Sequence, residues 1–294
     1  MSRPLASWMT YAAYPLVIGG GIGIHTGLMA AQVPLLWSTN ISVVLGMLAV
    51  SWLEARIPYE LDWKAVWGDV RNDLLFLVVV QALLPKVLTF LAAVTLVYWR
   101  EASGLEVVAL WPGHLPIGLQ VVLMVLGADL LRYGFHVLCH NNSLLWRLHA
   151  VHHSPKKLYW LNVGRFHPVE KALQFLLDAL PFIVLGVGPR VLGFYFVFYA
   201  LNGFLQHSNV DVRLGFLNYL ISGPELHRWH HSRLAEESNA NYGNNVIVWD
   251  ILFKTRFLPK ERTVGELGLQ RGDYPQSFLA QMTIPGPYDV EENG

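Results

Sequence analysis

The stretch PLASWMTYAAYPLVIGGGIGIHTGLMAAQVPLLWSTNISVVLGMLAVSWL, residues 4–53, contains no Asp, Glu, Lys or Arg. A helix that crosses a membrane needs about 20 mainly apolar residues. The stretch therefore has room for two spans, which we predict near Tyr11–Ala31 and Trp37–Leu53 with Pro34 in the turn. Because the apolar region of a signal peptide is much shorter, we predict an integral membrane protein rather than a cleaved leader.

Two later apolar runs predict two more spans, near Leu74–Trp99 and Ile117–Phe135. Pro85 and Lys86 lie in the middle of the third span. We therefore expect a kink at the proline, because proline lacks the N–H that a helix interior needs. We expect Lys86 to face protein or a water-filled pocket, because a charged side chain is costly in lipid.

Two shorter apolar runs, Ala172–Val187 and Val191–Gln206, predict a helical hairpin that enters the membrane and returns. Each run is about 16 residues long, which is short for a full crossing. The predicted fold class is an all-α integral membrane bundle with about four transmembrane helices, this hairpin and a cytosolic histidine-rich cap. We treat 1–294 as a single domain. Its transmembrane helices fall in 1–135, its histidine-rich catalytic core in 136–257 with the hairpin at 172–206, and its tail in 258–294.

The composition supports a membrane protein and excludes several other classes. Apolar residues make up 53% of the chain and charged residues only 14%, whereas a soluble domain has about a quarter. The formal net charge is zero, so nothing indicates a nucleic-acid partner. The single cysteine, Cys139, excludes an internal disulfide framework and a metal site built from cysteines.

Basic residues predict the orientation in the membrane. The predicted cap contains many of them, whereas the link between spans three and four offers only Arg100. Positive charge collects on the cytoplasmic side of membrane proteins, so we expect the N-terminus and the cap in the cytosol, in a bacterial inner membrane or the endoplasmic reticulum. The basic cap residues are Arg147, Lys156, Lys157, Arg165, Lys171, Arg228, Arg233, Lys254 and Arg256.

Ten of the twelve histidines lie between positions 136 and 231, and most of them are grouped. His136 and His140 form the pattern H-x-x-x-H, and residues 149–153 and 227–231 each form H-x-x-H-H. On a helix, residues three and four apart share one face, with Cβ atoms about 5–6 Å apart. Each group therefore directs two or three imidazoles at one point, which favours metal binding. His25 and His114 stand alone, and we expect them to be structural.

The number and surroundings of these histidines limit the choice of metal. Eight to ten imidazoles exceed the four ligands of a tetrahedral zinc, and two ions with four or five ligands each fit that number. The zinc-protease signature H-E-x-x-H is absent, because Ala150 follows His149 and Arg228 follows His227. Imidazole suits several metals. A membrane zinc hydrolase and a non-enzymatic metal-handling protein therefore remain alternatives to an iron oxidase.

The groups HVLCH (136–140), HAVHH (149–153) and HRWHH (227–231), in that order, resemble the fatty acid hydroxylase and sterol desaturase superfamily of membrane di-iron oxidases. The resemblance covers about Asp129–Phe257 and is closest to the branch that contains alkylglycerol monooxygenase and bacterial sterol-desaturase-like proteins. This chain departs from the family pattern at Val137, where Arg is common, and at Lys254, where Gly is usual. The segments between the groups that carry the resemblance are NVGRFHPVE (162–170), QHSN (206–209), NYGNN (241–245) and WDILFKT (249–255).

The resemblance implies an oxidoreductase that uses two iron ions and O2 to hydroxylate or desaturate a C–H bond of a membrane lipid. Fatty acyl, sterol and ether-lipid chains are all substrates of that kind. Because no haem-binding domain accompanies the core, we expect electrons from a separate donor protein or a pterin. No catalytic side chain beyond the metal ligands is expected. The resemblance and the spacing assign eight ligands: His136, His140, His149, His152, His153, His227, His230 and His231.

Further residues are expected to bind the metal or to orient its ligands. His207, at the cytosolic end of the hairpin, is the expected ninth ligand. Asp129 falls on one helical stripe with His136 and His140, so it is expected to accept a ligand N–H or, equally, to pair with Arg132. The whole set of possible ligands and orienting residues is His167, Asp129, Asn202, Gln206, Asn162 and Arg165, with Glu170, Glu225 and Asp250 as weaker candidates.

Two of these regions have simpler interpretations. The alternative role of His167 is a hydrogen bond that fixes the loop before Pro168. The aromatic run at 194–199 is expected to pack against helices or lipid rather than to form a substrate wall.

Overall fold

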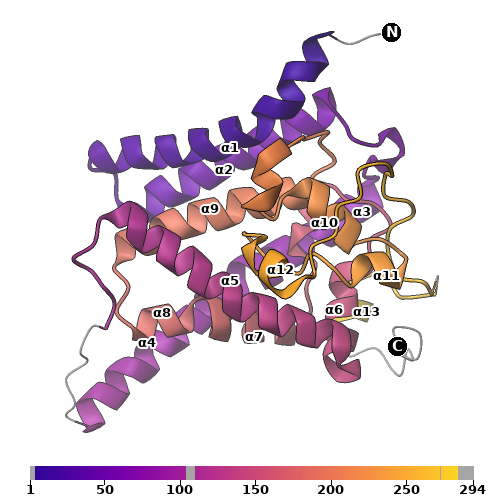
Figure 1. Cartoon of the computed structure of the whole chain (residues 1–294). Helices are drawn as coiled ribbons and strands as arrows, with labels where there is room; N and C mark the ends of the chain where they lie inside the picture. The colour runs from indigo at the N-terminus through magenta and orange to yellow at the C-terminus, as the bar shows by residue number, and fades with distance from the viewer. Residues whose placement is uncertain (1–3, 104–109, 272, 284–294) are drawn as a thin grey trace.

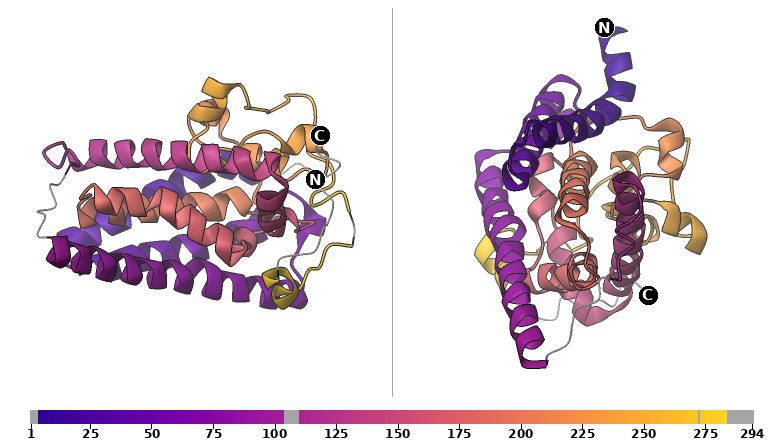
Figure 2. Two further views of the ribbon diagram at one scale, coloured as in Figure 1. Left: turned by 90° about the horizontal axis from the view of Figure 1, so that it is seen from below. Right: turned by 90° about the vertical axis from the view of Figure 1, so that its left-hand side faces the viewer.

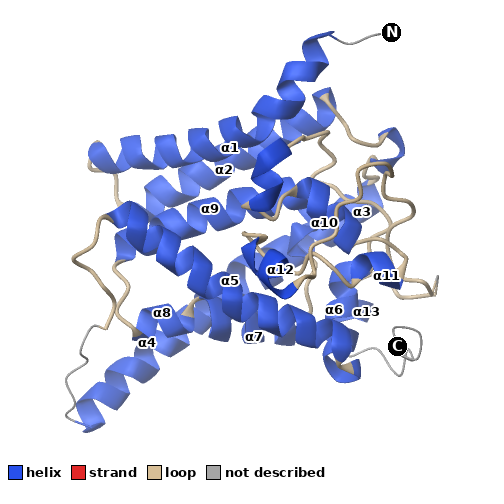
Figure 3. Ribbon diagram, in the orientation of Figure 1, coloured by secondary structure: helices blue, strands red, loops and turns tan. Residues whose placement is uncertain are grey.

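The computed structural model describes residues 4–103, 110–271 and 273–283. Within these residues every regular element is helical, and β pairing is limited to isolated bridges such as Pro58 with Val210. Figure 3 shows this absence of strands in the described chain. The all-α class predicted from the sequence is therefore confirmed.

Four helical stretches in the described chain are long and apolar enough to cross a membrane, which confirms the predicted bundle. They are α1 (Pro4–Ala30), α2 (Leu35–Arg56), the stretch Trp67–Trp99, and α5 (Ile117–Asn141). Figure 1 shows them running lengthwise, with the α1–α2 turn and the start of α5 at one end. The chain is a membrane protein.

The third span is longer and less regular than predicted. It consists of α3 (Trp67–Leu75), the π-helix η2 (Phe76–Leu83) and α4 (Leu84–Ser103). It begins at Trp67 because the Asp69 carboxylate accepts the Val66 N–H at 3.2 Å and caps the helix. The irregularity precedes Pro85 instead of being a kink at the proline. Proline has no N–H and crowds the carbonyl four residues back, and a π-helical turn accommodates such a misfit.

Helix α9 (Pro189–His207) lies at the centre of the bundle. It packs against α1, α2, α5 and the 3-10 turn η3 (Trp160–Gly164), as the end-on view in Figure 2 shows. Leu201 fits between Gly21 of α1 and Gly46 of α2. A Cβ atom at these glycines would lie 2.2 and 2.0 Å from Leu201 methyl groups. Small residues at such contacts let membrane helices approach closely, which fixes α9 and the His207 at its end.

The first arm of the predicted hairpin is broken. It forms α7 (Pro168–Asp178) and the short helix α8 (Leu180–Val184), separated at Ala179 just before Pro181, and α9 is the second arm. Glu170, Lys171 and Gln174 are buried on α7. The first arm therefore turns a polar face toward the protein interior, where it becomes part of the site.

Short helices form the cap at the end of the bundle where α5 finishes (Figures 1 and 2). At that end the Asn142 side chain accepts the N–H groups of Leu144 and Leu145, each at 3.1 Å, and so starts α6 (Ser143–His153). The described part of the predicted tail returns to the bundle, where Phe278 packs edge-on against Phe76; residues 284–294 lie outside the described residues. The remaining cap elements are η1 (Leu61–Trp63), η4 (Gly215–Tyr219), α10 (Pro224–His230), α11 (Ala235–Ser238), α12 (Val248–Phe253) and α13 (Phe278–Met282).

Candidate metal centre

The nine histidines expected as ligands come together in two adjacent groups. In each group one ring nitrogen per residue lies within 4.8 Å of all the others. The rings of His153 in the first group and His231 in the second are 4.7 Å apart between centroids, so the two groups share a boundary. The first group contains His136, His140, His149, His153 and His230, and the second His152, His207, His227 and His231.

Helical spacing explains how the two H-x-x-H-H segments serve both groups. On α6, His149 and His153 are four residues apart and enter the first group, whereas His152 points to the second. The third segment divides the opposite way, with His227 and His231 in the second group and His230 in the first. Residues four apart share a helical face, so each helix offers a pair to one group and a single ring to the other.

Acceptor atoms outside the two groups orient most of the rings. The Nδ1–H groups of His136 and His230 donate to the Tyr242 and Ala240 carbonyls at 2.8 Å. His149 donates to Glu170 at 2.8 Å and His140 to the Asn239 side-chain oxygen at 3.0 Å. These bonds place the proton on Nδ1 and leave Nε2 as a lone pair facing the group interior. Protein metal sites use this arrangement to orient and strengthen histidine ligands.

The second group has two such outer contacts. Asn162 accepts the Nδ1–H of His207 at 3.0 Å, and the Arg165 carbonyl accepts that of His152 at 3.3 Å. Both were expected to orient ligands. The Arg165 guanidinium binds Asp73, which is fully buried in α3. The ion pair between α3 and the 160–165 segment therefore holds the carbonyl that faces His152.

The inner nitrogens stand at the separations expected of ligands to one ion. His136 and His149 Nε2 are 2.9 Å apart, His227 and His207 Nε2 3.0 Å, and His153 and His230 Nε2 3.1 Å. A metal–imidazole bond is about 2.1 Å, so ligands at a right angle are about 3.0 Å apart and tetrahedral ligands about 3.4 Å. Because His136 and His149 both donate from Nδ1, their Nε2 lone pairs face each other, and a cation between them would remove the repulsion. The residues therefore fit two metal ions, one in each group.

Burial keeps the cap imidazoles neutral, as metal binding requires. Removal from water, followed by the neighbouring His149 ring, lowers the pKa of His230 to about 3. Burial also holds the pKa of His152, His153, His227 and His231 well below the usual histidine value. In addition, the His140 Nε2 atom is buried and has no hydrogen-bond partner in the described chain. A buried polar atom of this kind normally has a bonding partner, and a bound metal ion would be that partner.

Several residues expected beside the ligands have other roles. Asp129 contacts no histidine ring and does not pair with Arg132; it accepts the N–H groups of Asn245 and Val246. Both expectations for Asp129 were wrong, because α5 turns this carboxylate toward the 239–246 segment while Arg132 binds Asp178 at 2.7 Å. His167 joins neither group. Its Nδ1 accepts the Val169 N–H and caps α7.

Asn202 and Gln206 tie α9 to the cap rather than contact a ligand ring. Gln206 donates to the Ser222 carbonyl at 2.6 Å and to the Asn244 carbonyl at 2.7 Å. Asn202 accepts the Tyr14 hydroxyl hydrogen at 2.7 Å. The Glu225 carboxylate binds the Leu214 N–H and the Asn218 amide. Asn202, Gln206 and Glu225 therefore position α9 and the loops of the cap, and they affect the histidines only through these elements.

The loop 239–246 contains the NYGNN segment of the family resemblance, but the sequence did not indicate it as a source of ring acceptors. It supplies three of the acceptors around the first group, from Asn239, Ala240 and Tyr242. The Asp250 carboxylate holds this loop by accepting the Tyr242 and Gly243 N–H groups at 2.7 and 2.8 Å. Lys254 ends α12 with φ 63°, a left-handed conformation. This backbone explains why the family usually has glycine there, since glycine adopts positive φ without steric cost.

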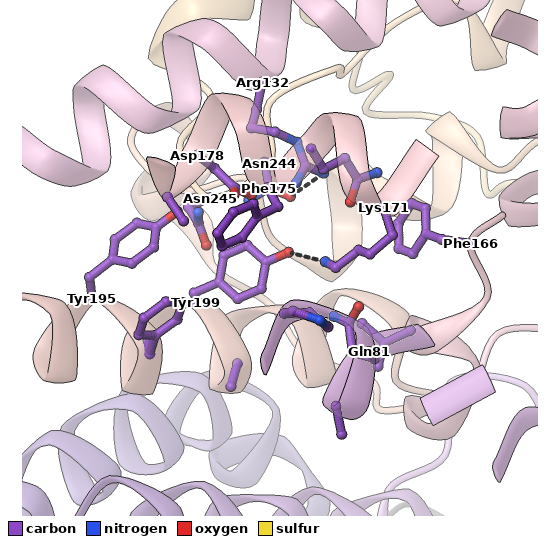
Figure 4. A pocket seen from close by; sticks show the side chains of 18 of the residues that line it. Gln81, Arg132, Phe166, Lys171, Phe175, Asp178, Tyr195, Tyr199, Asn244 and Asn245 are labelled. Atoms are coloured by element: carbon purple, nitrogen blue, oxygen red, sulfur yellow. Dashed lines mark hydrogen bonds and ion pairs between the residues drawn. The ribbon is translucent and has the colours of Figure 1, made fainter. Parts of the chain in front are cut away.

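A cavity of about 790 Å³ leads from the histidines into the bundle. His136, His149 and His152 are among the histidines on its wall, and α4 and α9 contribute apolar residues such as Phe90 and Phe196. Tyr195 and Tyr199 also line it, so the aromatic run at 194–199 forms part of the cavity wall, contrary to the expectation of packing alone. Lys86 is an exposed residue that borders the cavity. Figure 4 shows the polar side chains of this wall.

Comparison with known proteins gives a consistent result. The model of the fatty acid hydroxylase family matches residues 121–255. Ornithine lipid hydroxylase OlsE of Rhizobium tropici is 32% identical over 279 residues, which cover 92% of this chain and 82% of that protein. Human alkylglycerol monooxygenase is 30% identical over 139 residues, 47% of this chain and 31% of that protein. No solved structure matches the chain. The long alignment and the family match together show that the chain belongs to the fatty acid hydroxylase family.

Proposed function

We propose that the protein is a membrane-bound, iron-dependent monooxygenase that uses O2 to hydroxylate a C–H bond of a polar membrane lipid. The observation that carries the proposal is the pair of histidine groups at the wall of a lipid-sized cavity. The match over nearly the whole chain to an ornithine lipid hydroxylase supports hydroxylation over desaturation and makes an ornithine-containing lipid the first substrate to test.

Iron is favoured over zinc by the donor set. The first group offers five imidazoles and the second four, whereas a structural zinc is closed by four ligands in a tetrahedron. Bound iron would supply the activation of O2, with two electrons and two protons from outside and water as the second product.

The side chains of this chain prepare the site for that chemistry. Asn162, Glu170 and the loop carbonyls keep the imidazole protons on the outer nitrogens, so the inner nitrogens stay available to metal. Eight of the nine histidines are buried, which limits the access of water and protects a reactive centre from side reactions. The cavity holds the lipid against the ligands His136, His149 and His152. Position then selects the carbon, since the bond nearest the metal reacts.

The cytosolic face is the orientation that we propose, because the basic residues of the sequence collect in the cap. Reductant from a separate donor protein or a pterin would reach the cap from the cytosol. The cap, rather than the apolar end of the bundle, is the side from which electrons must arrive, because the histidines lie at the ends of α5 and α9 and on α6 and α10. Figure 1 shows α6 and α10 at that end of the bundle.

The test is a lipid comparison combined with metal analysis. Cells that express the chain should contain a lipid with one added oxygen, identified by mass spectrometry, and purified protein should hold close to two iron ions. His149→Ala and His230→Ala should lose both properties, whereas His114→Ala, in an exposed loop, should keep both. A single tightly bound zinc ion with full activity under nitrogen would refute the proposal in favour of a hydrolase.

A further inference from the structure

Lys171, on α7, is a buried cation that the metal chemistry leaves without a role. Only 6% of its surface is exposed. Its Nζ donates to the Tyr199 hydroxyl at 3.2 Å and lies 5.5 Å from the centres of the Phe166 and Tyr199 rings, as Figure 4 shows. Lys171 forms no ion pair with a carboxylate anywhere in the described chain. A buried charge without a counterion is costly, so its counterion should come from outside the chain.

The two carboxylates that line the same cavity, Asp178 and Glu170, do not pair with Lys171, and Glu170 Oε2 is buried without a hydrogen-bond partner in the described chain. Asp178 binds Arg132 at 2.7 Å. One Glu170 oxygen accepts both the His149 Nδ1–H and the Gln174 amide, each at 2.8 Å. Lys86, which lines the cavity from α4, forms no ion pair with a described residue either. Helices α4 and α7 pack side by side, so two lysines without carboxylate partners face one cavity from neighbouring walls.

The Lys171 ammonium lies close to the metal ligands. The Phe166 ring stacks on the His152 ring, with centroids 4.3 Å apart and an angle of 13° between the planes. The same Phe166 ring lies beside the ammonium. The ammonium and His152 are therefore at most the sum of these two separations apart. The upper bound on that distance is about 10 Å, so the part of a lipid that adjoins an anion held by Lys171 could reach the second histidine group.

We propose that Lys171, supported by Lys86, binds an acidic group, carboxylate or phosphate, at the polar end of the lipid substrate. The carbon that is oxidised then lies near that polar end, while the apolar chain extends along the wall formed by Phe90 and Phe196. This inference rests on the proposed function. It adds the substrate class, an acidic lipid, and the region of the molecule that is attacked.

The experiment measures binding without turnover. Full-length, metal-loaded protein in detergent is kept under nitrogen without reductant and titrated with N-palmitoylglycine, which has a free carboxylate, or with its uncharged methyl ester. The wild type should bind the acid at least about tenfold more tightly, because a charge-assisted hydrogen bond in a dry site is strong. Lys171→Met should bind acid and ester alike and keep its metal, whereas Lys171→Arg should retain most of the preference for the acid. Lys260 is an exposed lysine, and Lys260→Met, the control, should match the wild type.

Further measurements distinguish a lipid anion from free phosphate. They also distinguish a failure of this inference from a failure of the proposed function. Phosphatidic acid should compete with N-palmitoylglycine, whereas millimolar inorganic phosphate should not; competition by phosphate alone would overturn a lipid site. Tyr199→Phe, a milder change, should weaken the preference several-fold. Equal binding of acid and ester by the wild type, or a full preference in a folded Lys171→Met protein, would also overturn the inference. An intact preference without oxygen addition to any lipid would count against the oxidase proposal alone.

Discussion

Glu170 shows how a single side chain decides the protonation of a ligand. Its carboxylate accepts the His149 Nδ1–H at 2.8 Å and is itself held by Gln174, one helical turn further along α7. The carboxylate fixes the tautomer and the direction of the ring, and it makes the opposite nitrogen a stronger donor to a metal. From the sequence, Glu170 was only a weaker candidate for orienting a ligand, because nothing in the α7 sequence indicates that α6 packs against α7.

Replacing Glu170 with Ala should lower iron affinity or turnover by about 10- to 100-fold, the usual effect of removing an outer partner of a metal-binding histidine. Iron content by elemental analysis, measured during dialysis against a chelator, gives the result directly. Glu266→Gln is the matched control, since Glu266 pairs with Arg233 on the exposed surface. A Glu170→Ala protein that retains two iron ions as tightly as the control would show that this contact is dispensable.

His167 offers the opposite test, because it resembles a ligand in sequence but caps α7 in the structure. His167→Asn should keep the metal, turnover and stability close to wild type, since Asn is among the best N-cap residues. His167→Ala should keep the metal but lose about 1 kcal/mol of stability with the cap. Thermal unfolding and metal analysis together check this, and loss of one ion from His167→Asn would restore His167 to the ligand set.

Spacing along the chain and the family resemblance predicted eight of the nine histidines that converge, and the place of His207 at the end of the hairpin predicted the ninth. Three of their six outer partners, Asn162, Arg165 and Glu170, were among the candidates, and the other three were not predicted. The carbonyls of Ala240 and Tyr242 belong to the backbone, which has no signature in a sequence. Asp129 was misassigned because the rotation of α5 about its axis depends on what packs around it, and the 239–246 loop, not a histidine, faces that carboxylate.

At the scale of elements, the loop 239–246 links α12 to the first histidine group. Gly243 leaves no room for a side chain, since a Cβ atom there would lie 2.2 Å from the Val246 carbonyl oxygen and 2.8 Å from the Asp250 carboxylate. The loop must therefore move if the residue grows. Its carbonyls at Ala240 and Tyr242 would move with it, away from His230 and His136.

Gly243→Ala should therefore weaken the five-histidine group while the four-histidine group, oriented by Asn162 and the Arg165 carbonyl, keeps its ion. We expect iron content to fall from near two toward one, with loss of turnover. Gly265→Ala is the matched control, because a Cβ atom there meets nothing within 4 Å. Equal loss of both ions in Gly243→Ala would indicate general unfolding rather than a local change in the loop, and unchanged iron would contradict the role of the loop.

The long elements were predictable for a simple reason: an uncharged apolar run has few alternatives to a membrane helix. The deviations arise where polar groups gain partners only in the folded protein. The third span was predicted to begin near Leu74, but α3 already begins at Trp67, and its Asp73 is buried against Arg165, far away in the sequence. The first hairpin arm turned its polar face inward because that face lines a cavity that the α7 sequence alone does not reveal.

At the scale of the whole molecule, the four spans put the histidine groups at one end of the bundle and the α1–α2 turn and the start of α5 at the other. The distribution of basic residues predicts that the histidine end faces the cytosol. This prediction is independent of the metal ligands, because it depends only on charge in the links. It is also necessary for the proposed chemistry, because the cap must face the compartment that holds the reductant.

Cysteine labelling can determine this orientation. Lys156→Cys and Glu236→Cys place an exposed thiol near the second and third histidine segments, and Ala31→Cys and His114→Cys place one at the opposite end. The wild-type chain is the blank, because its only cysteine, Cys139, is 1% exposed. A membrane-impermeant thiol reagent added to intact cells should label only the second pair, and inverted vesicles should reverse the pattern. Labelling of Lys156→Cys in intact cells would place the centre away from the cytosolic reductant, and labelling of His114→Cys and Lys156→Cys from the same side would contradict the four-span arrangement itself.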